Sequence, residues 1–183
     1  MAGIAAKSYC DALFEIAKEE KKLDVYKEQL CMVKDTIFDD PKCKMVMAHP
    51  KIKKDAKKEL LDTIYRTEIE GFLMNFLKIL VDKNRFMILP DITKEFIKQY
   101  NMEHNIQVVY VRSASALSRD NKAALQTALA AKLNKTIDLV CNVDEDLIAG
   151  IRIKINDQII DNTALSRLTR LKKQVVESVD ITK

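Results

Sequence analysis

The spacing of apolar positions changes close to residue 105. Before it, apolar residues recur three and four positions apart, which is typical of amphipathic helices. After it, short stretches alternate apolar and polar residues or are rich in β-branched residues, which is typical of strands. We therefore predict an α+β chain, with an N-terminal six-helix bundle over residues 1–105 and a small α/β domain with a mixed sheet over residues 106–183.

One predicted helix carries more apolar surface than a single core face needs. The helices are expected at about residues 4–20, 25–38, 41–49, 53–66, 68–83 and 90–104. In the fifth, one wide apolar face is formed by Ile69, Phe72, Leu73, Phe76, Leu77 and Leu80. Apolar side chains elsewhere on this helix are Met74, Ile79 and Val81. A helix that is apolar on most sides either lies centrally in its bundle or has a second partner.

The second half predicts a sheet with two helices. Strands are expected at residues 106–112, 136–143, 151–155 and 158–160, the first of them buried. A helix begins after Ser118, with a packing face of Ala124, Leu125, Ala128, Leu129 and Leu133. Asn156 and Asp157 suit a two-residue hairpin turn, and Asp161 or Thr163 caps a last helix. That helix is expected to pack through Leu165, Leu168, Leu171 and Val175. Alternation places Arg152 and Lys154 on the solvent side of the sheet.

Composition and motifs argue against an enzyme. Apolar residues make up 48% and charged residues 32%, as in a globular protein, and the net charge is only +4. The four cysteines form no CxxC pair, the two histidines are isolated, and the acidic run 144–146 lacks the spacing of a calcium loop. With three glycines in all, no phosphate-binding loop occurs. We expect no catalytic residues, no cofactor and no metal.

The N-terminal segment and the longest apolar runs bear on location. The first twenty residues lack the basic-then-apolar order of a secretory signal. No apolar run approaches the roughly 18 residues that span a bilayer. We expect the protein to work in the compartment where it is made, most simply a bacterial cytoplasm.

A lysine cluster leaves a second interpretation open. Five lysines gather at the start of the fourth predicted helix: Lys51, Lys53, Lys54, Lys57 and Lys58. They form either a solvated helix face or an electrostatic contact with nucleic acid or acidic lipid. Asp55 and Glu59 interleave with them, and no aromatic residue is available for base stacking. The alternative to a protein-binding scaffold is therefore a helical RNA-binding module with an α/β appendage.

Three ordered motifs carry a family resemblance over almost the whole chain. Residues 9–17 (YCDALFEIA) resemble an opening YAxALFxxA pattern. Residues 75–90 are similar to NFLxLLxxNxRxxxLP, and residues 146–153 (DLIAGIRI) to DLIGGxxI, followed by matching Asp161, Thr163, Leu168 and Leu171. The chain is similar to the delta subunit of the bacterial ATP synthase, the relative of the mitochondrial oligomycin-sensitivity-conferring protein. Two departures are Ala149 and Thr163, which stand where glycine and serine are common; a positive φ at Ala149 would be strained.

The resemblance implies a non-catalytic connector of the peripheral stalk, or stator, of a rotary ATP synthase. It implies that the helical domain binds the N-terminal segment of an alpha subunit in a groove between its first and fifth helices. Carried over to this sequence, the groove residues are Tyr9, Leu13, Ile16, Ala17, Phe72, Phe76, Ile79 and Lys83. Structural motif residues are Asn75, Arg85, Pro90, Asp146, Gly150 and Asp161.

The resemblance also implies the other partners and the location. The second domain would contact the C-terminal end of the b subunit, and nucleic acid is not expected as a partner. Membrane association would be indirect, through the complex, at the cytoplasmic face of the bacterial cell membrane.

Overall fold

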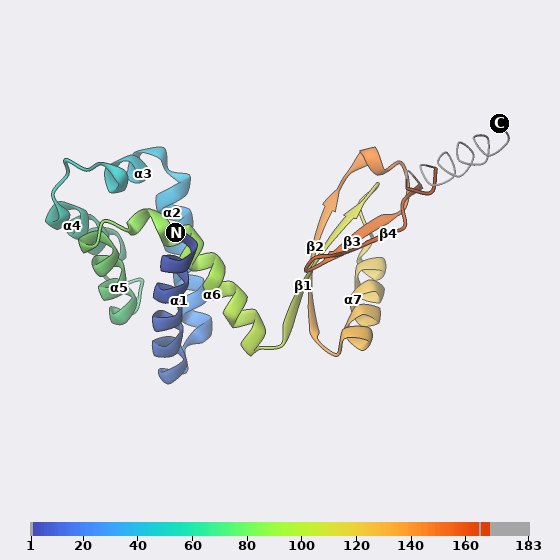
Figure 1. The fold of residues 1–183 in the computed structure, drawn as a ribbon, viewed down its shortest axis with the longest axis horizontal. Coiled ribbons are helices and arrows are strands. Elements are labelled where there is room, and N and C mark those ends of the chain that lie inside the picture. Colours follow the sequence, from blue (N-terminus) through green and yellow to red (C-terminus); the bar gives the residue numbers. More distant parts are fainter. Residues whose placement is uncertain (1, 165, 169–183) are drawn as a thin grey trace, which may run out of the picture. The chain divides into compact units, whose positions relative to one another are not determined.

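A computed structural model describes residues 2–164 and 166–168. The chain divides into two compact units, residues Met1–Tyr100 and Asn101–Lys183. The division falls inside the last turns of one helix, without a glycine- or proline-rich linker. The predicted mixture of helices and a mixed sheet is confirmed (Figure 1).

The first unit is built from helices. These are α1 (Ala2–Glu19), α2 (Leu23–Asp39), α3 (Pro41–Ala48), α4 (Lys54–Tyr65), α5 (Gly71–Asp82), the short 3-10 helix η1 (Phe86–Ile88) and α6 (Leu89–Glu103). The sequence pattern did not predict η1. The core draws on every α-helix of the unit, and its largest fully buried side chains are Tyr26, Tyr65, Phe96, Leu13, Leu30, Ile37, Leu61, Leu73, Leu77, Leu80, Leu89 and Ile92. No described helix is both long and apolar enough to cross a bilayer.

Local capping explains where α3 begins and α5 ends. Asp40 accepts a hydrogen bond from the Lys42 backbone N–H at 2.8 Å, and Pro41 takes the first helical position, as predicted. Asn84 follows α5 with a φ of +54°, and the Arg85 N–H donates to the Leu80 carbonyl at 2.8 Å. This left-handed ending satisfies the last carbonyls of α5, a position that suits asparagine.

The lysine cluster is largely part of the fold. The Lys54 ammonium donates to the Asp82 carbonyl at 2.6 Å, and Lys58 pairs with the Asp82 carboxylate at 2.7 Å. Lys57 is buried and donates to the Met47 carbonyl, in the last turn of α3, at 2.7 Å. Cations at helix C-termini interact favourably with the helix dipole. Three lysines therefore connect α4 to the ends of α3 and α5, which removes much of the motivation for an RNA-binding surface.

The described residues of the second unit form a four-stranded mixed sheet with a helix, α7, packed on it (Figure 1). Its elements are β1 (Ile106–Ser113), α7 (Arg119–Leu133), β2 (Thr136–Val143), the 3-10 helix η2 (Glu145–Leu147), β3 (Ile151–Ile155) and β4 (Gln158–Asp161). The strand order is β2-β1-β3-β4, with β1 and β2 parallel and the other pairs antiparallel. The predicted hairpin is confirmed, because Ile155 pairs with Gln158 across Asn156 and Asp157.

Two expectations for this unit are corrected. Ala124 and Ala128 are exposed; α7 packs through Leu125, Leu129, Ala130 and Leu133 instead. Alanine is small enough to lie on either side of a helix, so the pattern could not fix its facing. The strand β1 is buried on one face only, since Tyr110 is 51% exposed on the other.

Candidate functional site

Residues of two separate sequence motifs meet at Tyr9. The ring of Tyr9 on α1 packs edge to face against Phe76 on α5, with ring centroids 6.2 Å apart. The guanidinium of Arg85, just beyond α5, lies 5.8 Å from the centroid of the Tyr9 ring. A cation this close to an aromatic ring is attracted by it. The first and middle motifs are therefore adjacent in the fold and fix α1 against α5.

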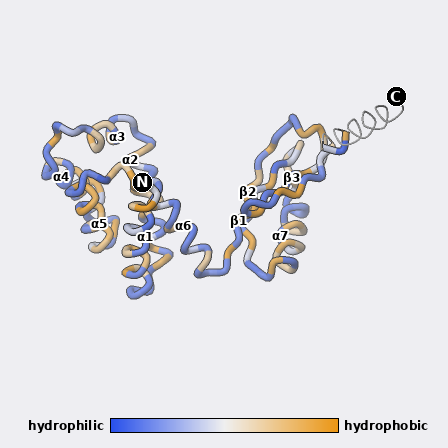
Figure 2. The backbone as a smooth tube through the Cα atoms, in the orientation of Figure 1, coloured by the Kyte–Doolittle hydropathy of each residue, from blue (hydrophilic) through white to orange (hydrophobic). Residues whose placement is uncertain are grey.

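The helix α5 has a buried face and an apolar exposed edge. Its buried side chains are Leu73, Met74, Phe76, Leu77, Leu80 and Val81. Phe72 and Ile79, seven residues apart and so on one side of the helix, remain 56% and 47% exposed. The tube in Figure 2 shows α5 as a largely hydrophobic segment. The excess of apolar surface that the sequence indicated is thus real, and it lies on the side of α5 next to Phe76.

The facing side of α1 adds smaller apolar residues. Tyr9 and Ile16 are half-buried, and Ala12 between them is exposed. These positions share one helix face because they are spaced by three, four and seven residues. We call the surface formed by Tyr9, Ala12, Ile16, Phe72, Phe76 and Ile79 the α1–α5 strip.

The structure divides the predicted groove residues into surface and core. Leu13 and Ala17 are 1% and 0% exposed and belong to the core, so they are not part of the accessible surface. They face inward because the core side of α1 lies about one fifth of a turn from Tyr9. Phe76 is 9% exposed, so it contributes little accessible area to the strip. Lys83 and Asn75 are exposed, at the end and on the edge of α5. The groove residues carried over from the resemblance did not include Ala12, which is exposed between Tyr9 and Ile16.

Pro90 and Asp146 lie outside the strip. Pro90 is half-buried in the first turn of α6, where its missing N–H removes no helical hydrogen bond. Asp146 is exposed in η2, in the loop between β2 and β3.

The third motif builds a tight loop rather than a reaction centre. After the buried Leu147, Ile148 adopts φ +63° and ψ −56°, and the Ala149 N–H donates to the Leu147 carbonyl at 2.7 Å. This is a γ-turn of the rarer positive-φ kind, which is strained for a β-branched residue. The residues with a positive φ are thus Ile148 and Gly150, the two neighbours of Ala149. Alanine is accommodated at 149 for that reason.

Gly150 permits a close approach between two backbone segments. Its φ is +92°, and a Cβ atom there would lie 2.4 Å from the Asn162 carbonyl oxygen. The approach is held by hydrogen bonds on both sides, from Asn162 N–H to the Ile151 carbonyl at 3.1 Å and from Ala164 N–H to the Ala149 carbonyl at 2.9 Å. Glycine is required at this position on both steric and conformational grounds.

Asp161 organises the link to the final helix. Its carboxylate accepts hydrogen bonds from the Thr163 N–H at 3.0 Å and hydroxyl at 2.7 Å, and pairs with Arg152 at 2.8 Å. Hydrogen bonds from the Ser166 and Thr163 side chains hold the pKa of Asp161 well below its usual range. The Thr163 hydroxyl in turn accepts from the Ser166 N–H at 3.2 Å, so Thr163 is the cap of the two that were predicted. Of the predicted inward residues of this helix, Leu168 is 57% exposed, and Leu165, Leu171 and Val175 lie outside the described residues.

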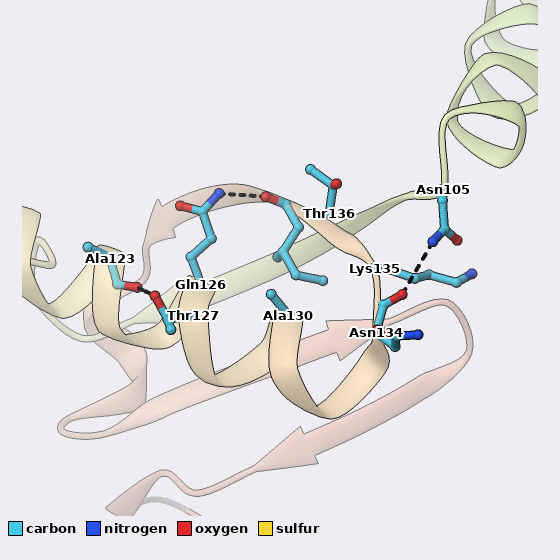
Figure 3. Close-up of a pocket in the computed structure, with 9 residues that line it drawn as sticks. Asn105, Ala123, Gln126, Thr127, Ala130, Asn134, Lys135 and Thr136 are labelled. Carbon is cyan, nitrogen blue, oxygen red and sulfur yellow. Dashed lines mark hydrogen bonds between the residues drawn. The ribbon is translucent and has the colours of Figure 1, made fainter.

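The described residues also hold a hollow beside α7, of about 600 Å³, without chemical groups of a catalytic kind (Figure 3). Its polar side chains serve the backbone: Gln126 donates to the Ile137 carbonyl at 2.7 Å, and Asn105 to the Asn134 carbonyl at 3.2 Å. Within the described part of the chain, no three metal-ligating side chains cluster. Burial, with a smaller effect of Asp11, raises the pKa of the Cys10 thiol to about 12, which makes it a poor nucleophile.

Comparisons with known proteins agree with the motifs. The family model described as ATP synthase delta (OSCP) subunit matches residues 5–175. ATP synthase subunit delta of Bacillus mycoides is 34% identical over 177 residues, covering 96% of this chain and 98% of that protein. The same subunit of Bacillus cytotoxicus is 34% identical over 176 residues, with 96% and 97% covered.

A solved structure shares the fold. A chain in the cryo-EM structure of the Toxoplasma gondii mitochondrial ATP synthase hexamer superposes with a TM-score of 0.72 at 19% identity, covering 96% of this chain and 97% of that one. The family match over nearly the whole length is decisive. The chain belongs to the ATP synthase delta (OSCP) subunit family and is a non-catalytic subunit of the ATP synthase.

Proposed function

We propose that this subunit is the connector of the peripheral stalk in a proton-driven rotary ATP synthase. It joins the catalytic head to the b subunits of the membrane sector and so resists the torque of the rotor. It acts at the cytoplasmic face of the bacterial cell membrane, to which it is attached only through the complex. The family assignment and the contact surfaces described above support this role.

The single observation that carries the proposal is the α1–α5 strip. In this account α1–α6 form one bundle, residues 1–105 act as the head-binding domain, and the strip receives the N-terminal helical segment of an alpha subunit. Phe72 and Ile79 are seven residues apart on α5, which is about two helical turns. This distance suits apolar anchors spaced three, four and seven residues apart on the incoming helix. Burying a Phe or Ile side chain fully contributes about 1.5–3 kcal/mol, so completing the burial of two half-exposed ones contributes roughly half of that each.

The strip also has polar margins that orient a helix. Lys83 is exposed at one end of α5, and the Arg85 guanidinium lies over Tyr9 at the same end. Cations beside an apolar strip favour a partner with carboxylates next to its apolar face. Residues 106–183 form the second contact domain in this proposal and bind the C-terminal end of the b subunit.

The test is a calorimetric titration of the full chain with a peptide covering the N-terminus of the alpha subunit from the same organism. Apolar docking predicts saturable binding that changes little between about 50 and 300 mM salt, concentrations that separate it from phosphate-driven binding, which weakens steeply. No binding at tens of micromolar peptide to a folded chain would contradict the proposal. Salt-sensitive binding of single-stranded RNA, with no binding of the peptide, would favour the RNA-binding alternative.

A further inference from the structure

Among the described residues, nothing packs on the second face of the sheet in the second unit, and that face is not polar. The helix α7 packs on one face, over Val109, Val111, Ile137 and Ile153. Successive side chains of a strand point to opposite faces, so the intervening residues lie on the other side. Three of them are large, apolar and open to solvent: Tyr110, Val140 and Ile159 are 51%, 36% and 61% exposed.

Strand register aligns these residues. Tyr110 is directly opposite Val140 on β2 and Lys154 on β3, and Lys154 is directly opposite Ile159 on β4. Directly opposed residues lie on the same face, and neighbouring strands are about 4.8 Å apart. One row therefore crosses all four strands in the order Val140, Tyr110, Lys154, Ile159. We call it the transverse row.

The strand β1 carries a further apolar residue on this open face. Val108 precedes Tyr110 by two residues and is only half-buried on this open face. A strand that is apolar on both faces is typical of one covered on both sides. The composition of β1 thus fits a sheet whose second face is covered by a partner, while α7 covers the first.

The charges around the transverse row indicate what kind of partner fits. Arg152 is held by Asp161 at 2.8 Å and is therefore neutralised locally. Arg112 stands 3.6 Å from Asp144 but keeps 60% of its side chain exposed. Lys154 has no ion pair within the described residues. Asp138, opposite Val108, is the acidic group at the other end of the face. Tyr110 is therefore flanked by Lys154 across the sheet and by Arg112 along β1, whose longer ion pair with Asp144 leaves most of its side chain exposed.

We propose that this face docks an amphipathic helix whose apolar stripe covers Val108, Tyr110 and Val140 and whose carboxylates lie over Lys154 and Arg112. The occupant is the acidic, amphipathic end of the stalk partner, so the inference rests on the proposed function of the second unit and assigns it a surface. Apolar contacts supply most of the affinity, and the two cations set the orientation of the helix. The side of the sheet expected to be merely solvated, with Arg152 and Lys154, becomes an interface.

The experiment is a calorimetric titration of the full chain with a peptide covering the C-terminal end of the b subunit from the same organism. Tyr110→Ser and Lys154→Glu are each expected to weaken binding about tenfold or more, which corresponds to about 1.4 kcal/mol. The matched control is Lys122→Glu, the same charge reversal at an exposed position on α7, which should change affinity less than about twofold. Thermal melting checks that each variant is folded.

A second measurement tests whether the sheet face around Tyr110 is accessible to solvent before the partner binds. In hydroxyl-radical footprinting of the isolated full chain, Tyr110 should be oxidised much faster than the buried Tyr26 and Tyr65. Peptide should then protect Tyr110. Slow oxidation of Tyr110 without peptide means that the chain itself or a second copy covers the face, and it overturns the inference.

The remaining outcomes separate this inference from the proposed function. Unchanged binding of the b peptide to both sheet variants overturns the inference and leaves the connector role intact. If the alpha peptide binds and the b peptide does not, the inference and the stalk-side half of the proposal both fail. If neither peptide binds the folded chain, the connector proposal itself fails.

Discussion

Tyr9 packs edge to face on Phe76, with ring centroids 6.2 Å apart and planes inclined at 74°, and so joins the first helix to the fifth. Aromatic pairs in this arrangement contribute about 0.5–1.5 kcal/mol beyond their area burial. The contact supports the exposed residues Phe72 and Ile79 beside it. Its integrity is therefore a condition for any binding at the α1–α5 strip.

Tyr9→Leu should lower the free energy of unfolding by about 1–2 kcal/mol, because it removes both the ring contact with Phe76 and the cation–π contact with Arg85. Tyr9→Phe retains the ring and should stay within about 0.5 kcal/mol of the parent chain. Urea unfolding monitored by far-UV circular dichroism measures both changes. Equal destabilisation by the two substitutions would show that the hydroxyl, not the ring, matters.

Gly150→Ala should destabilise the second unit strongly, by roughly 2–4 kcal/mol, because a Cβ atom meets the Asn162 carbonyl and the residue must keep a positive φ. Gly71→Ala is the matched control. Gly71 begins α5, and no neighbouring atom lies within 4 Å of the place that an alanine methyl group would take, so alanine should be neutral or stabilising by up to about 1 kcal/mol. Differential scanning calorimetry compares the two, and a neutral Gly150→Ala would refute the close approach.

The lowered pKa of Asp161 predicts that the stability of the second unit falls in acid. Hydrogen bonds lower its pKa in the folded state, so its contribution to stability is fully present above the unfolded pKa of about 3.9 and is lost as pH falls toward the folded pKa. Asp161→Asn should therefore destabilise the chain at about pH 7, and the difference from the parent should shrink below about pH 4. Urea titrations at about pH 7, 5 and 3.5 test this; a difference that is constant with pH would exclude the carboxylate as its source.

The fold and the strip differ in how far the sequence could predict them. Periodicity located the main helices and strands, the hairpin at Asn156 and Asp157, and the Thr163 cap, because each depends on local pattern or on a side chain that bonds its own backbone. The surplus of apolar residues on α5 was also visible. Helical spacing predicts which side of a helix a residue lies on, but not how much of that side the neighbouring helices cover. It therefore could not separate the core Leu13 from the half-buried Ile16.

Other features depend on contacts between distant segments. The positive φ at Ile148 follows from the meeting of the loop with residues 162–164, which no local pattern encodes. The exposure of Tyr110 likewise depends on which side of the sheet α7 covers. Residues 106–112, rich in β-branched residues, were predicted to form a buried strand, and Tyr110 of this strand is 51% exposed.

The central claim is that the α1–α5 strip binds the alpha subunit. Phe72→Asp and Ile79→Asp place a carboxylate on exposed positions of the strip, and Met45→Asp, at a residue 64% exposed on α3, is the matched control. The most direct measurement is the affinity of all three folded variants for the alpha-subunit peptide, with melting temperatures recorded alongside. We predict that the two strip variants lose at least tenfold in affinity at nearly unchanged melting temperature, while Met45→Asp binds as the parent does. Parental affinity in both strip variants would contradict the account.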